Sequence, residues 1–419
     1  MLSNIKLIWS KIGILMSGTV LSQLVPLLIM PILTRIYTPE QFGLVANYLA
    51  MATFLSMLTM GRLETAIVLP QSDIVSNRVK NLCLFLSTLS LLVILFLCVV
   101  FSHNISELIG KEGVYLLPVF TFCYSMYQVI NYSLMRQKNY KALAKLKIIL
   151  SIVLVSFQFL FSHFDVGLLL ALTFSYLSIL VFDLIFKTNI FKFGNFKFCR
   201  VTKLKRMTKA LFEYKSIPLY TAPASLIDSG RNLSVNYLIA NGFGNALLGQ
   251  YSLSLRILQG PIQLVNAVLG QVFFSEVSRV ERKKVYPILC KSVVFLALLG
   301  IVPFLLIYSY AVDFFVLIFG VEWRVAGEIA ISLTPWLYFN FVSSPISSVF
   351  LIINKQKVSF YFSCSYFITA ASSIYFARGE IVETLSFFSY SMSLLLLVYI
   401  TLALLFSRNY SNCESFNYT

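Results

Sequence analysis

The stretch LCLFLSTLSLLVILFLCVVF, residues 82–101, runs for twenty residues without a charged side chain. At ~1.5 Å per residue, an α-helix of this length spans ~30 Å, the thickness of the hydrocarbon core of a bilayer. Comparable runs recur along the whole chain, which is 58% hydrophobic, only 12% charged, and has a mean hydropathy of +0.82. Soluble domains are usually about a quarter charged. The sequence therefore predicts an all-α polytopic membrane protein.

Hydrophobic runs predict about twelve membrane-spanning helices. The first run is too long for the core of a signal peptide and lacks a small-residue cleavage site, so we expect it to remain as the first helix. The fifth and sixth runs are divided only by a short loop around His163 and Asp165. The expected spans are residues 12–33, 42–62, 80–102, 114–135, 146–163, 165–186, 217–240, 247–274, 288–311, 325–351, 356–377 and 381–407.

The basic residues indicate how the chain is oriented. Of the 33 Lys and Arg residues, 26 lie at the termini or in loops on one side, and four lie on the other side. Cytoplasmic loops of membrane proteins collect Lys and Arg, so this distribution predicts that both termini are cytoplasmic. It also accounts for the net charge of +16 without nucleic acid as a partner, because the basic residues lie between the hydrophobic runs.

The chain reads as two related halves. Shifting the sequence by 206 positions places Gly43 over Gly249, each at the start of the second span of its half. Between the halves lies a basic loop, which we expect to link them and to fix topology. We expect a six-helix bundle at 1–186, a cytoplasmic linker at 187–216 and a second six-helix bundle at 217–419. Internal repeats of this kind are common in transporters.

Catalytic motifs are absent from the sequence. It contains no P-loop, no GxSxG, no HExxH and no EF-hand loop. The seven cysteines include no CxxC and read as small core side chains, and both histidines fall in loops on the outer side. We therefore expect no enzyme activity, no cofactor and no metal site. Without an ATPase domain, transport would draw on an ion gradient, the substrate gradient or a partner.

Three charged residues lie within the seventh and eighth spans. Asp228 and Arg231 share one helix face, and Arg231 and Arg256 each lie about nine residues from the outer end of their span, ~13–14 Å deep. Buried charge is expensive and faces protein or water. One interpretation is an Asp228–Arg231 ion pair that holds helices together. The other is a hydrated cationic cavity for an anionic substrate, to which Arg256 adds a second positive charge.

Four further charged residues lie near the cytoplasmic ends of spans: Arg62, Glu64, Asp183 and Glu276. Side chains at such positions commonly extend to the membrane interface, which is the expectation for this group. Asp183 and Glu64 are also the candidates for carrying a coupling proton or ion.

Two stretches resemble a known family. PLLIMPILTRIYTPEQFGLVANY (26–48), followed by GRLETAIVLP (61–70), resembles the N-terminal pattern of polysaccharide exporters of the Wzx type. LGQYSLSLRILQGPIQLVNAVLGQVFFSEVSR (248–279) resembles the second-half pattern of the same proteins. These exporters are O-antigen flippases of the multidrug/oligosaccharidyl-lipid/polysaccharide exporter superfamily, and the resemblance covers essentially the whole chain.

The resemblance implies a MATE-like, V-shaped fold of two six-helix bundles in the bacterial inner membrane. It implies a substrate that is an oligosaccharide repeat unit on undecaprenyl pyrophosphate, moved from the cytoplasmic to the periplasmic leaflet by alternating access. A polysaccharide polymerase and a chain-length regulator are the implied protein partners. Relatives are thought to line the cavity with cationic residues, a role that Arg231 and Arg256 would fill, with Asp228 beside them.

Two alternatives stay open at this stage. A multidrug or cation antiporter of the same superfamily is expected to hold carboxylates in its cavity, whereas the deep charges here are mainly arginine. A membrane-embedded O-antigen polymerase or ligase is expected to have a long outer loop with catalytic residues, and no outer loop here exceeds about a dozen residues. Both features favour the flippase.

Overall fold

The structure is a computed structural model that describes residues 2–70, 72–186, 222–277, 280–353, 355–377 and 379–412. Within these ranges the side chains of 2–17, 182–186, 267, 271, 272 and 275 are not described. The predicted basic linker at 187–216 lies outside the described residues, as do residues 217–221.

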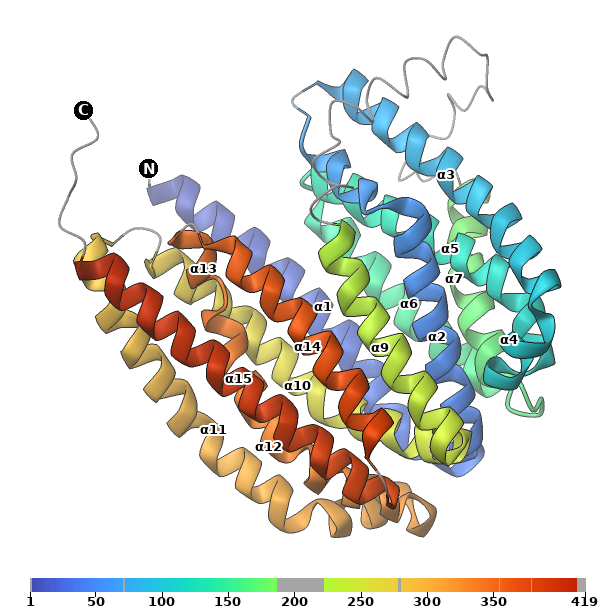
Figure 1. The fold of residues 1–419 in the computed structure, drawn as a ribbon. Helices are drawn as coiled ribbons and strands as arrows, with labels where there is room; N and C mark the ends of the chain where they lie inside the picture. Colours follow the sequence, from blue (N-terminus) through green and yellow to red (C-terminus); the bar gives the residue numbers. More distant parts are fainter. Residues whose placement is uncertain are drawn as a thin grey trace. The chain divides into compact units, whose positions relative to one another are not determined.

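The described ranges are almost entirely helical and contain no strand (Figure 1). Each of the twelve predicted spans overlaps one long helix, so the prediction of an all-α fold is confirmed. The elements are α1 (Leu2–Ile36), α2 (Pro39–Met60), η1 (Leu63–Val68), α3 (Asp73–Val100), α4 (Ser102–Ile109), α5 (Lys111–Arg136), α6 (Tyr140–Leu160), α7 (Gly167–Phe186), α9 (Ala222–Phe243), α10 (Asn245–Val277), α11 (Arg282–Phe319), η4 (Val321–Trp323), α12 (Arg324–Ile346), α13 (Val349–Ile352), α14 (Gln356–Phe376) and α15 (Ile381–Asn412).

Seven of the described helices are long and apolar enough, by length and composition, to cross a membrane: α1, α2, α3, α5, α6, α11 and α15. Helices α7, α9, α10, α12 and α14 fall outside this group. Among them, α9 carries Asp228 and Arg231, and α10 carries Arg256.

The chain divides into two compact units, Met1–Tyr237 and Leu238–Thr419. In the first unit α1 packs on α6, and α5 packs against α2, α3 and α7. In the second unit α12 packs against α10, α11 and α15, and α14 packs on α15. Most of α9 therefore belongs to the first unit, although the chain enters it after the predicted linker.

The start of α2 is fixed by the first family-like stretch. Thr38 caps the helix, since its side chain accepts a hydrogen bond from the Gln41 backbone N–H while the Gln41 side chain accepts one from the Thr38 N–H. The Gln41 amide also donates to the Asp165 carbonyl at 2.8 Å, and the Tyr37 hydroxyl donates to the Gln158 carbonyl. These contacts join the α1–α2 corner to the α6–α7 loop.

The second family-like stretch fixes α10 to α12. The Gln250 side chain donates to the Glu322 carbonyl at 2.6 Å and accepts from the Ala326 N–H at 3.0 Å. One turn later the Ser254 hydroxyl bonds the Ala326 carbonyl. Buried polar groups need such partners, so this face of α10 packs against α12.

Gly327 marks the closest approach of α12 to α11. A Cβ atom added at Gly327 would lie 2.6 Å from Val312 Cα and 3.0 Å from the Ala311 carbonyl oxygen. Both are backbone atoms and cannot move aside as a flexible side chain could. Only glycine allows the two helices to pack at this distance.

We expect Gly327→Ala to lower the stability of the second unit by about 1–3 kcal/mol, the usual cost of overpacking. Thermal unfolding of the detergent-solubilised protein measures the effect. Gly242→Ala is the matched control, because nothing lies within 4 Å of a Cβ at Gly242. Equal transition temperatures for the two variants would contradict the close approach.

Candidate functional site

The motif GRLETAIVLP folds into a left-handed turn followed by a 3₁₀ helix. Gly61 closes α2 at φ 53°, and Arg62 follows at φ 58°. A non-glycine residue in this region is uncommon and carries a conformational cost, which is often tolerated at functional sites. The turn directs the chain into η1, where Glu64 is only 6% exposed.

Arg136 holds this segment against the end of α5. Its guanidinium donates to the carbonyls of Ile67 and Pro70 and forms an ion pair with Asp73 at 2.8 Å. The Ser76 hydroxyl adds a 2.8 Å hydrogen bond to the Ile67 carbonyl. The position of Glu64 is therefore set by several contacts from α3 and α5.

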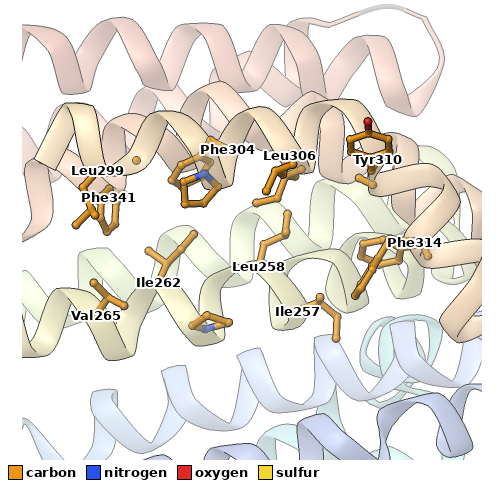
Figure 2. A pocket seen from close by; sticks show the side chains of 16 residues that line it. Ile257, Leu258, Ile262, Val265, Leu299, Phe304, Leu306, Tyr310, Phe314 and Phe341 are labelled. Carbon is orange, nitrogen blue, oxygen red and sulfur yellow. The ribbon is translucent and has the colours of Figure 1, made fainter.

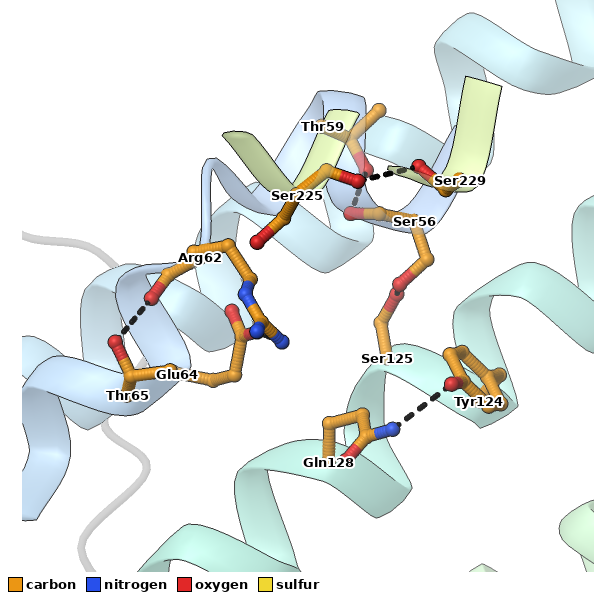
Figure 3. A network of polar contacts seen from close by, with 10 residues as sticks. All are labelled: Ser56, Thr59, Arg62, Glu64, Thr65, Tyr124, Ser125, Gln128, Ser225 and Ser229. Atoms are coloured by element: carbon orange, nitrogen blue, oxygen red, sulfur yellow. Dashed lines mark hydrogen bonds and ion pairs between the residues drawn. The ribbon is translucent and has the colours of Figure 1, made fainter. Parts of the chain in front are cut away.

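Figure 3 shows the polar network around this turn. An Arg62 guanidinium nitrogen lies 4.0 Å from a Glu64 carboxylate oxygen. From α5, the Gln128 amide donates to the Tyr124 hydroxyl at 2.9 Å, and the Ser125 and Ser56 hydroxyls are 2.8 Å apart. The Ser56–Ser125 contact joins α2 to α5, and the Arg62–Glu64 contact lies within the turn.

Glu64 is not fully satisfied by this network. Its Oε2 atom is buried and has no hydrogen-bond partner among the described residues, as is true of Arg62 Nε. Burial raises the pKa of the Glu64 carboxyl above its ordinary value, against the smaller lowering effects of a backbone hydrogen bond and of Arg62. The expectation that Glu64 reaches the membrane interface is wrong, because the turn at Gly61–Arg62 folds it inward.

A carboxyl whose pKa is raised in the folded state binds its proton more tightly there than in the unfolded chain. Its contribution to stability is present at low pH and is lost as pH rises from about 4.3 through the raised pKa. We expect Glu64→Gln to remove that loss. Thermal unfolding of both proteins across this window measures the difference, and identical pH dependence for both would contradict the buried carboxyl.

Asp228 and Arg231 lie on α9, against α2. The Asn236 amide donates to the Ala46 carbonyl at 3.1 Å, which holds α9 to α2. Asp228 is exposed and interacts electrostatically first with Arg231 and then with Arg62. The predicted Asp228–Arg231 proximity thus extends to a third charge, Arg62, that sequence reasoning assigned to the interface.

Arg256 lies on α10 in the second unit, on the face opposite α12. At about 100° per residue, it points away from the face that holds Gln250 and Ser254. Its own face carries Gly249, Ser252, Gln259, Gly260 and Gln263. In the described part of the second unit, no carboxylate forms an ion pair with Arg256. This face of α10 therefore carries small and polar side chains together with one positive charge.

Both arginines lie deeper than the sequence predicted. Helix α9 continues to Phe243 and α10 begins at Asn245, with Gly244 at φ 89° as the only residue between them. Arg231 is thus ~18 Å and Arg256 ~16 Å from the outer end of its helix. These depths are close to the middle of a ~30 Å hydrocarbon core. The two residues belong to different units, so each is placed within its own unit only.

The remaining candidate residues are placed less fully. Asp183 lies near the end of α7, and its side chain is outside the described part of the structure. Glu276, near the end of α10, is exposed, as expected for a side chain at the interface. Within the described residues, no group of three or more His, Cys, Asp or Glu side chains could hold a metal ion.

A family model described as "Polysaccharide biosynthesis protein" matches residues 32–328, which is more than half of the 419-residue chain. The chain belongs to this family. A comparison with curated proteins found no match.

Solved structures with the same fold are transporters of the MOP superfamily. An inward-facing multidrug resistance MATE family transporter has a TM-score of 0.67 at 13% identity, over 94% of this chain and 96% of that one. An outward-facing transporter of the same kind has a TM-score of 0.57 at 14% identity, over 97% and 96%. A MOP superfamily transporter from Pyrococcus furiosus, described as having a binding pocket of reverse polarity, has a TM-score of 0.55 at 14% identity, over 96% and 95%. This polysaccharide biosynthesis protein thus has the MATE-type fold that the sequence predicted.

Proposed function

We propose that the chain is a flippase for a polysaccharide repeat unit, O-antigen or a related glycan, linked to undecaprenyl pyrophosphate. It would move this lipid from the cytoplasmic to the periplasmic leaflet of the inner membrane, without enzymatic activity. Membership of a polysaccharide biosynthesis family and a transporter fold support this class of function. The observation that carries the substrate proposal is Arg256, a cation near mid-membrane on a hydrophilic helix face, to which no acid is paired among the described residues of its own unit.

Arginine suits a pyrophosphate because its planar guanidinium can donate two parallel hydrogen bonds to phosphate oxygens. Arg231, with Asp228 beside it, is the other candidate contact for the substrate. Leaving water costs the pyrophosphate most in the bilayer interior, so fixed positive charge at this depth has its largest effect on translocation. The halves 1–186 and 217–419 would alternate in access, linked by the basic loop 187–216.

Glu64 is the candidate for ion coupling, with Asp183 as the second. A buried carboxyl with an unbonded oxygen can bind a proton when the site is open to one side of the membrane and release it when the site is open to the other side. The same buried carboxyl favours the alternative of a drug or cation antiporter. A cationic-dye efflux assay separates the two functions, because a flippase is not expected to extrude the dye.

Deleting the gene for this chain from its host should abolish the surface polysaccharide. Lipid-linked repeat units should then accumulate and be accessible only from the cytoplasm. Re-expression should restore the polysaccharide, with drug susceptibility unchanged throughout. Normal polysaccharide in the deletion strain, or polysaccharide loss without accumulated lipid-linked repeats, would contradict the proposal. Its protein partners would be the polymerase and chain-length regulator that use the exported repeat.

The proposed orientation places both termini in the cytoplasm, and α5 tests it at its two ends. Glu112 and Gln137 are exposed residues at opposite ends of this helix. In intact spheroplasts, we expect a membrane-impermeant maleimide to label Glu112→Cys and to spare Gln137→Cys, above the background of the native cysteines. The reverse pattern would invert the topology.

A further inference from the structure

A cavity of about 670 Å³ lies in the second unit between α10 and α11, with Phe341 of α12 beside Leu299 at one end (Figure 2). Figure 2 shows Ile257 and Phe314 at one end and Val265 and Leu299 at the other. Among the residues that line it, the Tyr310 hydroxyl is the only polar side-chain group. This volume is in the usual range for small-ligand sites.

The groove has the dimensions of a single hydrocarbon chain. Leu299 and Phe314 are ~22 Å apart along α11, at ~1.5 Å per residue. Spread over ~22 Å, a volume of about 670 Å³ leaves a mean cross-section of ~30 Å². An extended chain of methylene or isoprenoid groups fits along this length.

The groove lies on the face of α10 opposite its cationic face. Ile257 and Leu258 line one end of the groove, and Arg256 directly precedes them on the other side of the helix. An amphiphile with a chain long enough to curve around α10 would place an anionic head at Arg256 and its chain in the groove. A bilayer phospholipid keeps its head group at the membrane surface, whereas this position is ~16 Å below the outer end of α10.

We propose that the α10–α11 groove holds the polyprenyl chain of the transported lipid. This inference rests on the proposed function, because it assumes that the lipid carries its sugar on a polyprenyl pyrophosphate. Burial of apolar chain against Ile262, Leu306 and Phe304 supplies affinity that does not depend on the sugar. Helix α10 would then carry both contacts to the substrate, charge on one face and tail on the other.

Tryptophan substitutions at the rim can fill the groove without disturbing the core. Val265 and Leu299 line it and are 42% and 46% exposed. Val268 and Leu298 are the matched controls on the same helices, 39% and 63% exposed and absent from the lining. The test variants are Val265→Trp and Leu299→Trp, and the controls are Val268→Trp and Leu298→Trp.

The purified protein is reconstituted in phosphatidylethanolamine and phosphatidylglycerol vesicles with a polyprenyl phosphate that bears a diazirine in its isoprenoid chain. A second set of vesicles carries the diazirine in a phosphatidylethanolamine acyl chain. We expect the polyprenyl probe to label 257–265 and 299–314, and each test variant to reduce labelling about tenfold, since excluding a few methylene groups is sufficient. The controls should label like the wild type.

Equal labelling by the phospholipid probe, or labelling that the test variants leave unchanged, would overturn the proposal. A flipping assay on the same vesicles separates this failure from failure of the proposed function. Flipping by a wild type whose groove is not labelled rejects the groove alone. Selective groove labelling in a protein that does not flip the sugar-linked lipid supports a polyprenyl site and rejects the proposed function.

Discussion

Replacing Arg256 by alanine should reduce the rate of lipid translocation about 10- to 100-fold, the loss expected for one or two hydrogen bonds to a charged group. Alanine also removes an expensive charge from a membrane helix, so insertion and protein level should be unchanged or improved. Lysine should restore part of the rate because it keeps the charge but not the paired donors. Glutamate should be inactive.

The matched control for Arg256→Ala is Arg324→Ala. Arg324 starts α12, is 67% exposed along its side chain, and pairs with Glu328 in the same helix. Exposed pairs of this kind contribute little, so the variant should transport like the wild type. Surface polysaccharide in cells and translocation rate in vesicles are the two measurements. A fully active Arg256→Ala protein would remove the residue from the substrate path.

The second large effect concerns Asp228 and Arg231, whose roles a double-mutant cycle separates. If Arg231 serves the substrate, Arg231→Ala should lose most transport, and adding Asp228→Ala should not restore it. If the two residues only stabilise one another, each single variant should be harmful and the double variant should recover, because no charge is then left without its partner.

The structure favours the outcome without recovery. Asp228 interacts with Arg62 as well as Arg231, so removing Arg231 does not leave Asp228 without a nearby cation. For the same reason, Asp228→Ala alone should reduce transport less than Arg231→Ala alone. Recovery of the double variant to the wild-type rate would show that the pair is structural.

The fold was largely predictable from the sequence because the bilayer imposes a minimum length on each apolar run. Twelve runs matched twelve helices, and the misplaced ends have local causes. Gly244 turns the chain in a single residue, which lets α9 and α10 continue further than their hydropathy suggests. Such turns depend on backbone conformation and leave little trace in composition.

The candidate site was only partly predictable. Arg256 stood out because it is a lone charge within an apolar run, and the structure places it on a polar helix face. Glu64 was a candidate for ion coupling from the sequence, but the inward position of Arg62 and Glu64 was not predicted, because a place at a helix end is equally compatible with a side chain that extends to the interface. Their burial arises from the left-handed pair Gly61–Arg62 and from the Arg136 contacts, which join residues far apart in the sequence. The motif GRLE is the one signal that could have indicated them.

We propose that the chain moves a pyrophosphate-linked glycolipid by means of Arg256. The most direct test is the initial rate at which the purified protein, in vesicles, moves a fluorescent undecaprenyl-pyrophosphate oligosaccharide out of reach of an external quencher. We predict rapid translocation by the wild type and a rate about 10- to 100-fold lower for Arg256→Ala. A wild type no faster than protein-free vesicles, or an Arg256→Ala variant as fast as the wild type, would contradict the claim.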